Sequence, residues 1–495
     1  MADKTDGAPV APSGTIIRAA NGDILRFDST GMVMVLSDSV IDDIARRLPA
    51  SAAPAPAPAG QARAWIDPAI LGNVDAWDVR RDGEWLLFNA NLDGRQGARL
   101  FRRLAEAADA ESEPGIFADG AGPLYGMLSL GGARRAEGFP EPLAFPWHVL
   151  APADEIGAVG LAGTEEAAEQ DVLQRLPELT RDAAIADVIV ARQYRNHEAL
   201  TLFMARTETD TSASIADLAR GGAYANFLTA IRSLRAAAAR MDRQAVLYGI
   251  GLDYTLEDVT SDADTYRNEM FDLIGKLTAE IARMGLHCPP FLAQFDCGTH
   301  DLNDHPVLRA QWDLAWQGAS HGLCYTAPGY MFRQDRFGRP DIEALWQMAE
   351  MDACALELLH RGEEWSCPIF LLAEREPDAA RIRVKARAMS GLVIDADDPF
   401  GAGPCRGFSL AGADNAPELV GVAVAEDDPQ DLIVTFDKAP EGEALELRYG
   451  FGMSPDRAAL DYPSACGALR DDWASDSKTG VTLHRWALPA ALPVW

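Results

Sequence analysis

Short apolar runs alternate with long amphipathic segments between about residues 65 and 361. This alternation is typical of a parallel sheet with helices on both faces, because parallel strands need crossover helices that cover the sheet. The pattern therefore predicts a doubly wound α/β domain. The apolar runs are Trp85–Phe88, Val188–Val190, Leu200–Met204, Val246–Ile250, Phe291–Gln294 and Leu323–Tyr325. The predicted helices are Ala223–Met241, Asp264–Met284, Pro306–Trp316 and Asp341–Leu359.

Beyond about Pro368 the helical period disappears, and β-type runs are separated by Gly, Pro and Asp turns. Short strands at regular intervals predict a β-sandwich over residues 366–495. The runs are Arg381–Val384, Leu392–Ile394, Leu419–Val422, Leu432–Phe436 and Ala444–Tyr449.

The N-terminal segment, residues 1–48, carries three short apolar runs, and Asn21-Gly22 between the first two favours a tight β-hairpin. A short helix is expected over Ser37–Leu48. Residues 49–64 form a Pro/Ala linker, in which Pro49–Gly60 favours extended polyproline II geometry and a semi-rigid spacer. A small head on a stiff tether indicates a docking unit for another protein or particle, or alternatively an ordinary N-terminal extension. The α/β domain is then expected over residues 65–365.

The chain of 495 residues has 44 Lys plus Arg against 75 Asp plus Glu, a formal charge of −31. Such an acidic excess argues against nucleic acid or anionic lipid as the main partner, since both attract clustered cations. The seven cysteines contain no CxxC pair, which indicates reduced thiols. No secretion signal and no membrane-spanning run is evident, so we expect synthesis in the cytoplasm.

Several motifs in order resemble the SGNH (GDSL-type) hydrolase superfamily, most closely its sialate O-acetylesterase-like branch. Gly249–Asp258, Tyr266–Met270 and Pro289–Gln294 resemble a strand ending in a Q-G-E-S-D-like loop, a Tyr-led helix, and a strand carrying a Gln. Ser214–Leu218 with the following glycines resembles the family's G-G-T-S loop and its helix. The resemblance covers about Trp85–Leu359 and implies an SGNH-like fold followed by an accessory β-sandwich.

The groups that this resemblance would make catalytic are missing from the matching positions. The nucleophile turn is expected near Asn89–Gly97, which contains no Ser, and Glu208–Ser212 replaces the oxyanion loop. A carboxylate there would oppose a developing oxyanion. The D-x-x-H base motif corresponds to Asp335–Pro340, which contains no His, and an Arg cannot accept the proton at neutral pH.

The loops after the predicted strands still form a candidate cleft, because ligands bind outside the carboxyl ends of the strands in open α/β sheets. We expect no catalytic residue, cofactor or metal. Two histidines and two Asp in His300–His305 resemble metal ligands, but their close spacing and a capping role for Asp304 favour a structural interpretation. Tyr254, Trp312, Trp316 and Tyr330 are aromatic candidates for sugar contact, and the two Trp residues are more typical of a core. The candidate ligand-binding residues are Asn91, Asp93, Thr209, Asp210, Ser212, Asp253, Tyr254, Glu257, Asp258, His300, Asp301 and Arg339.

The sequence therefore predicts recognition of a surface or capsular polysaccharide without catalysis. The layout resembles a receptor-binding spike or fibre of a phage-like particle, such as a gene transfer agent, released by lysis. A homo-oligomer would raise avidity by linking weak sites. Two alternatives stay open: a purely structural subunit, and an active carbohydrate O-acetylesterase that uses Ser212 or Ser214 with His300, His305 or His321.

Overall fold

The computed structural model describes the chain except for stretches at the N-terminus and in several loops. The described residues are 14–19, 22–28, 31–34, 66–72, 74–92, 100–105, 115–120, 122–132, 135–154, 156–210, 214–254, 261–297, 306–335, 339–451 and 466–495. The chain divides into two compact units, Met1–Ala64 and Trp65–Trp495. In the first unit, β1 (Gly14–Ala19), β2 (Gly22–Asp28) and β3 (Gly31–Met34) form an antiparallel sheet. The predicted helix over residues 37–48 and the spacer over residues 49–60 lie outside the described residues.

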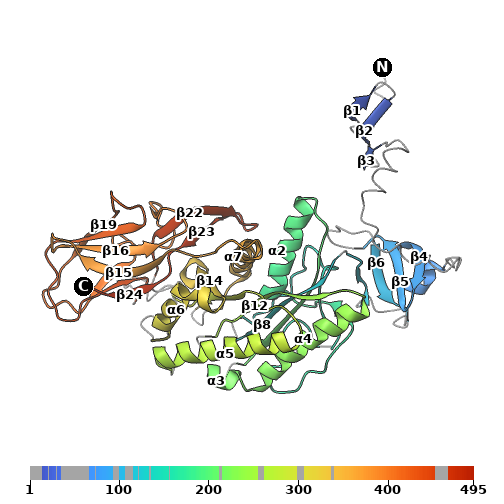
Figure 1. Ribbon diagram of the computed structural model, residues 1–495, viewed down its shortest axis with the longest axis horizontal. Coiled ribbons are helices and arrows are strands. Elements are labelled where there is room, and N and C mark those ends of the chain that lie inside the picture. The colour runs from blue at the N-terminus through green and yellow to red at the C-terminus, as the bar shows by residue number, and fades with distance from the viewer. Residues whose placement is uncertain are drawn as a thin grey trace, which may run out of the picture. The chain divides into compact units, whose positions relative to one another are not determined.

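A mostly parallel sheet forms the centre of the second unit (Figure 1). Its strand order is β10-β9-β11-β8-β12-β13-β14, and among these neighbours only β10 and β9 pair in an antiparallel manner. The strands are β8 (Leu124–Gly131), β9 (Val149–Pro152), β10 (Leu173–Arg175), β11 (Leu202–Thr209), β12 (Ala245–Gly251), β13 (Phe291–Phe295) and β14 (Leu323–Pro328).

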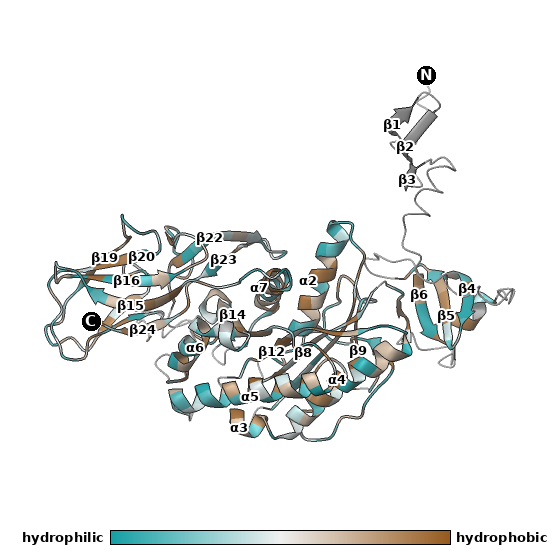
Figure 2. Ribbon diagram, in the orientation of Figure 1, coloured by the Kyte–Doolittle hydropathy of each residue, from teal (hydrophilic) through white to brown (hydrophobic). Residues whose placement is uncertain are grey.

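Helices cover both faces of this sheet, because side chains that alternate along each strand enter two different cores. Met127 and Phe203 pack in the core that contains α2 (Arg181–Arg195) and α7 (Ile342–His360). Their neighbours Leu128 and Met204 pack in the other core. That second core is covered by α3 (Ile215–Leu218), α4 (Gly222–Arg240), α5 (Ala263–Arg283) and α6 (Pro306–Trp316). In Figure 2 the central strands are mainly hydrophobic, whereas α5 carries polar and apolar turns.

The predicted helices are found close to their expected bounds, and residues outside them act as caps. Asp262 and Asp341 accept hydrogen bonds from the third helical N–H of α5 and α7 through their side chains. The predicted combination of a parallel-strand α/β region and antiparallel β-structure is therefore confirmed. Three short 3-10 helices, η1 (Pro68–Leu71), η4 (Gly318–Ser320) and η5 (Gly329–Met331), complete this part.

Two predicted strands of the parallel sheet are placed differently. Trp85–Phe88 lies in β5, within an antiparallel sheet of four strands: β4 (Ala76–Asp82), β5 (Trp85–Ala90), β6 (Leu100–Leu104) and β7 (Phe117–Ala118). Val188–Val190 lies in α2. The prediction was wrong here because α2 is buried between the sheet and α7, so its apolar run is as continuous as that of a buried strand. The first strand of the parallel sheet is β8.

The C-terminal region consists of three antiparallel sheets, with the orders β15-β16-β20-β19, β17-β22-β23 and β18-β21-β24. Buried contacts join it to the α/β region. The hydroxyl of Tyr330 donates to the Ala487 carbonyl at 2.6 Å, and the indole N–H of Trp312 donates to the Phe370 carbonyl at 2.8 Å. The strands are β15 (Ile369–Arg375), β16 (Arg381–Arg387), β17 (Val393–Ile394), β18 (Phe408–Ala411), β19 (Leu419–Val424), β20 (Asp431–Phe436), β21 (Glu446–Tyr449), β22 (Leu469–Asp476), β23 (Thr482–Trp486) and β24 (Ala490–Pro493).

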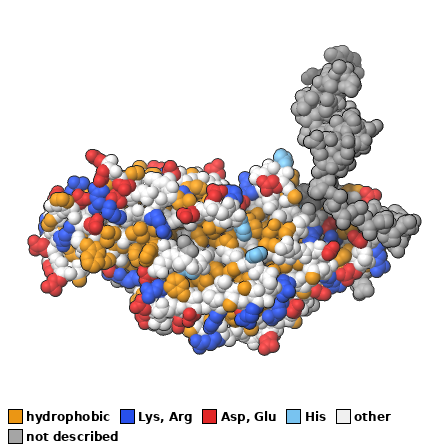
Figure 3. All heavy atoms as spheres, in the orientation of Figure 1, with side chains coloured by type: hydrophobic (Ala, Val, Ile, Leu, Met, Phe, Trp, Pro, Cys, Tyr) orange, Lys and Arg blue, Asp and Glu red, His pale blue; other side chains and the backbone are white. Residues whose placement is uncertain are grey.

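On the face drawn in Figure 3, Asp and Glu side chains are scattered among side chains of other types and form no single acidic patch. All seven cysteines are free thiols. Within the described ranges, no helix is long and apolar enough to cross a membrane.

Candidate functional site

Several polar side chains lie next to one another at the carboxyl ends of the central strands. Ser129 of β8 is in register with Thr207 of β11 and with Gly251 of β12. Asp253 follows two residues after Gly251, and its carboxylate accepts the backbone N–H of Gln294 on β13 at 2.7 Å. This is the edge at which open α/β sheets bind their ligands.

A buried guanidinium occupies this position. Arg135, in the loop after β8, donates to Asp182 at 2.5 Å and to Asp253 at 2.6 Å, and its side chain is fully buried. Asp182, in the first turn of α2, also accepts hydrogen bonds from the hydroxyls of Ser129 and Thr207. The arginine therefore joins the loop after β8, the loop after β12 and the start of α2.

A second arginine extends the network to α7. Arg181 forms ion pairs with Asp352 at 2.7 Å and with Asp253 at 3.3 Å. Asp352 also accepts the hydroxyl of Thr326 on β14 at 2.6 Å. Two guanidinium groups are thus paired with three carboxylates, those of Asp182, Asp253 and Asp352, and we refer to these five residues as the buried ion network.

The pKa directions in the network follow from burial and from the arginines. Although burial acts to raise the pKa of Asp253, Arg181 and Arg135 hold it below its ordinary value. For Asp352, burial prevails over the same arginines and raises the pKa. Burial acts to lower the pKa of Arg135, but the three carboxylates hold it above its ordinary value. Arg135 stays charged and is a hydrogen-bond donor, not a proton acceptor.

Two glycines beside Arg135 have no room for a side chain. A Cβ atom on Gly251 would lie 2.2 Å from the guanidinium of Arg135, and one on Gly131 would lie 2.6 Å from the Asp253 carbonyl oxygen. The first strand of the parallel sheet is followed by Gly131–Arg135, which contains no Ser. Asn89–Gly97 was expected after the first strand of the parallel sheet, but Asn89 lies in β5 of the antiparallel sheet, so this placement was wrong.

Four of the predicted ligand-binding residues lie at or just beyond the strand ends, but they are packed or bonded internally. Thr209 is buried at the end of β11, and the backbone N–H of Asp210 donates to the Gly131 carbonyl at 3.2 Å. Asp253 belongs to the buried ion network. Tyr254 is 1% exposed, and its carbonyl accepts the hydroxyl of Tyr266 at 2.7 Å.

The other predicted residues are separated from this group or lie outside the described residues. Asn91 follows β5 of the antiparallel sheet, and its side chain donates to Asp75 at 2.9 Å, so its placement at the edge of the parallel sheet was wrong. Arg339 is exposed before α7, where its backbone N–H donates to Asp335 at 2.9 Å. Asp93, Ser212, Glu257, Asp258, His300 and Asp301 lie outside the described residues.

The aromatic candidates are mainly packing residues. Tyr330 and Trp312 donate hydrogen bonds to backbone carbonyls of the C-terminal region, whereas Trp316 is 42% exposed. Of the alternative catalytic residues, Ser214 caps α3, and His321 accepts the Leu323 N–H at 3.1 Å. Among the described residues there is no group of three His, Cys, Asp or Glu that could hold a metal, and residues 300–305 lie outside them.

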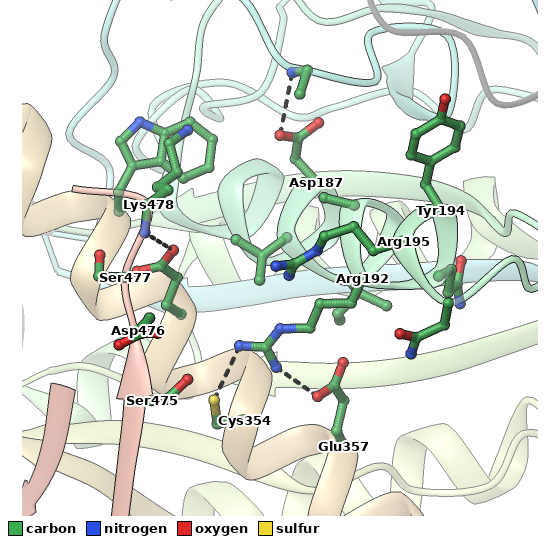
Figure 4. Close-up of a pocket in the computed structure, with 18 of the residues that line it drawn as sticks. Asp187, Arg192, Tyr194, Arg195, Cys354, Glu357, Ser475, Asp476, Ser477 and Lys478 are labelled. Atoms are coloured by element: carbon green, nitrogen blue, oxygen red, sulfur yellow. Dashed lines mark hydrogen bonds and ion pairs between the residues drawn. The ribbon is translucent and has the colours of Figure 1, made fainter. Parts of the chain in front are cut away.

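A large groove lies elsewhere in the second unit, between α2, α7 and the turn that joins β22 to β23 (Figure 4). It has a volume of about 1340 Å³. Arg192 crosses its floor from α2 to α7, donating to Glu357 at 2.5 Å and to the sulfur of Cys354 at 3.1 Å. Asp187 of α2 accepts the backbone N–H of Phe145 at 2.7 Å.

The β22–β23 turn forms one wall of this groove. The backbone N–H of Lys478 donates to Glu350 of α7 at 2.9 Å, and its ammonium lies 3.0 Å from the centre of the Trp346 ring. The side chain of Gln347 donates to Thr479 at 3.1 Å. These contacts hold the turn against α7.

Sequence reasoning missed both the groove and most of the network. Arg135, Arg181, Asp182 and Asp352 are spread over more than 200 positions, and only the fold brings them together. One signal was present: Asp352 stands inside a predicted helix, between the apolar residues Met351 and Ala353. A charge in such a position needs a buried partner.

The comparisons with known proteins give a distant structural similarity. No protein-family model and no curated protein matches the sequence. Among solved structures, one similar chain is described as a novel carbohydrate acetylesterase from Xanthomonas citri. The similarity is weak. The two chains are 14% identical with a TM-score of 0.46, and the match covers 83% of this chain and 89% of that chain.

Proposed function

We propose that this chain recognises carbohydrate on a degenerate SGNH-type scaffold and does not cleave esters. The observation that carries the proposal is the buried ion network at the carboxyl ends of the central strands. Arg135, which is fully buried, fills the position beneath the strand ends and binds two carboxylates there. The carbohydrate part of the proposal rests on the resemblance to the sialate O-acetylesterase-like branch.

Acyl transfer needs a nucleophile, a base that activates it, and donors that stabilise the oxyanion. Arg135 and Arg181 cannot act as the base, because their guanidinium groups stay protonated. Their positive charges are also neutralised by Asp182, Asp253 and Asp352, so the network has no net positive field for a developing oxyanion. The network therefore favours stability of the strand ends over catalysis.

The test is a pair of measurements on the full chain. Release of acetate from O-acetylated xylan and from p-nitrophenyl acetate should stay at the uncatalysed rate, while an array of bacterial polysaccharides should retain the protein. Acetate release that disappears in Ser212→Ala or His300→Ala would support the O-acetylesterase instead. An array with no retained protein would favour a purely structural subunit.

We also propose that the first unit, Met1–Ala64, attaches the chain to a larger assembly such as a phage-like particle. The support is the division of the chain after Ala64 together with the Pro/Ala-rich composition of residues 49–64. A chain lacking residues 1–64 should keep its circular dichroism spectrum but no longer sediment with particles from its source. Sedimentation of the shortened chain with the particles would contradict this role.

A further inference from the structure

We propose that the groove between α2, α7 and the β22–β23 turn binds a neutral oligosaccharide of several rings. This inference rests on the proposed function and moves the binding site away from the strand ends. The groove volume of about 1340 Å³ exceeds the ~300–1,000 Å³ that is typical of small-molecule sites. Room of this size fits an extended chain of rings rather than one small molecule.

A buried acceptor on the groove wall lacks a partner. Glu350 is 6% exposed, and its Oε1 accepts the backbone N–H of Lys478. Its Oε2 has no hydrogen-bond partner among the described residues. A buried acceptor without a donor is unfavourable, and a rotation of the Glu350 side chain toward the groove that it lines would let a ligand hydroxyl donate to Oε2 and remove this cost. Sugars are rich in such donors.

A donor on the opposite wall is also uncommitted. Figure 4 shows Arg192 and Arg195 extending from α2 into the groove. Arg192 is engaged by Glu357 and Cys354, whereas the structure gives the exposed Arg195 no ion pair or hydrogen bond within the described residues. Its planar guanidinium can donate to two neighbouring oxygens of a sugar ring.

Aromatic rings supply the apolar part of the groove. Tyr194, beside Arg195 on α2, is 47% exposed, and Trp473 of β22 is half-buried against Trp365 with ring centres 4.9 Å apart. A ring that presents one face and a polar tip can pack against the apolar face of a sugar. The groove therefore combines ring surfaces with donors and acceptors on facing walls.

The charge of the groove favours a neutral ligand. Five acidic and four basic side chains line it: Asp187, Glu198, Glu350, Glu357, Asp476, Arg192, Arg195, Arg361 and Lys478. The chain as a whole carries a formal charge of −31. A polyanionic glycan would be repelled by this field and would find no excess of cations in the groove.

The experiment titrates the full chain by calorimetry with maltohexaose, xylohexaose, N-acetylchitohexaose and, as the acidic comparison, a hyaluronan hexasaccharide. At least one neutral hexasaccharide should bind, and Arg195→Ala and Glu350→Gln should each weaken it about tenfold, as expected when a hydrogen bond to a charged group is lost. The matched control is Arg283→Ala in the last turn of α5, which should change the affinity less than twofold. Circular dichroism confirms that each variant is folded.

Each other outcome is decisive. If a neutral hexasaccharide binds the wild type and both groove variants equally well, the groove assignment is wrong while carbohydrate recognition stands. If the hyaluronan hexasaccharide binds more tightly than every neutral one, the assignment to a neutral ligand is wrong. If the wild type binds none of the four although the polysaccharide array retains it, this inference is overturned while carbohydrate recognition stands; if the array also retains no protein, both are overturned.

Discussion

Replacing Arg135 with methionine tests the buried ion network most sharply. Methionine fills much of the space of the arginine side chain but carries no charge. Arg135 donates to Asp182 at 2.5 Å and to Asp253 at 2.6 Å, and it lies 3.8 Å from Asp352. Among the described residues, the variant leaves the Asp182 carboxylate with the hydroxyls of Ser129 and Thr207, and it leaves Asp253 and Asp352 to share Arg181.

The expected loss of stability is large, because the variant leaves the carboxylates of Asp182 and Asp253 buried without their ion-pair partner. Removing one partner of a buried ion pair costs about 3–5 kcal/mol. Arg135 holds two carboxylates directly, so the free energy of unfolding should fall by at least about 4 kcal/mol. The surface variant Arg283→Ala removes a side chain that is 70% exposed, and its expected change is within about 0.5 kcal/mol.

Urea unfolding, followed by circular dichroism at the helical band, measures this loss of stability in the α/β region, which contains the buried ion network. Among the described residues, α2 to α7 all precede β15, so the helical signal reports on the α/β region. The Arg135→Met midpoint should be far lower than that of the wild type and of Arg283→Ala. A midpoint equal to that of the Arg283→Ala control would refute the reasoning that this arginine neutralises carboxylates closed to water.

Three further predictions concern packing and pH. Gly251→Ala should destabilise strongly in the same urea assay, because its Cβ would lie 2.2 Å from a guanidinium that two carboxylates hold in place, and unchanged stability would contradict this. Burial lowers the pKa of His148 from 6.5 to about 4, so the wild type should lose about 3 kcal/mol of stability as the pH falls from 6.5 to 4. His148→Leu should flatten that pH dependence, and an unchanged slope would contradict the assignment. Tyr330→Phe removes the hydrogen bond to Ala487 and should cost about 1–2 kcal/mol in thermal unfolding, whereas no change would show that this contact between the regions is unimportant.

Sequence periodicity predicted four of the helices that cover the sheet, with bounds close to those observed. α4, α5, α6 and α7 each place apolar residues at helical spacing against the sheet, and Asp262 and Asp341 mark two of the starts. The same reasoning misread α2, because burial on several sides makes its apolar run continuous. It also missed β8, whose run is interrupted by Gly126 and Ser129, although Ser129 serves the buried ion network.

The candidate site was predicted only in part, for a physical reason. Residues next to strand ends, such as Thr209 and Asp253, can be found from local pattern because the edge of the sheet is fixed by strand direction. The partners of Asp253 cannot be found in this way. Arg135 and Arg181 are far from Asp253 in the sequence, and only the tertiary fold brings them into contact. The groove depends in addition on a turn of the C-terminal region held against α7.

The most direct test of the central claim is acetate release from O-acetylated xylan by the purified full chain, measured against a blank without protein. Because the buried ion network fills the strand ends, we expect a rate equal to the blank over a wide range of protein concentration. A rate that rises in proportion to protein concentration and is abolished by Ser212→Ala or His300→Ala would contradict the account.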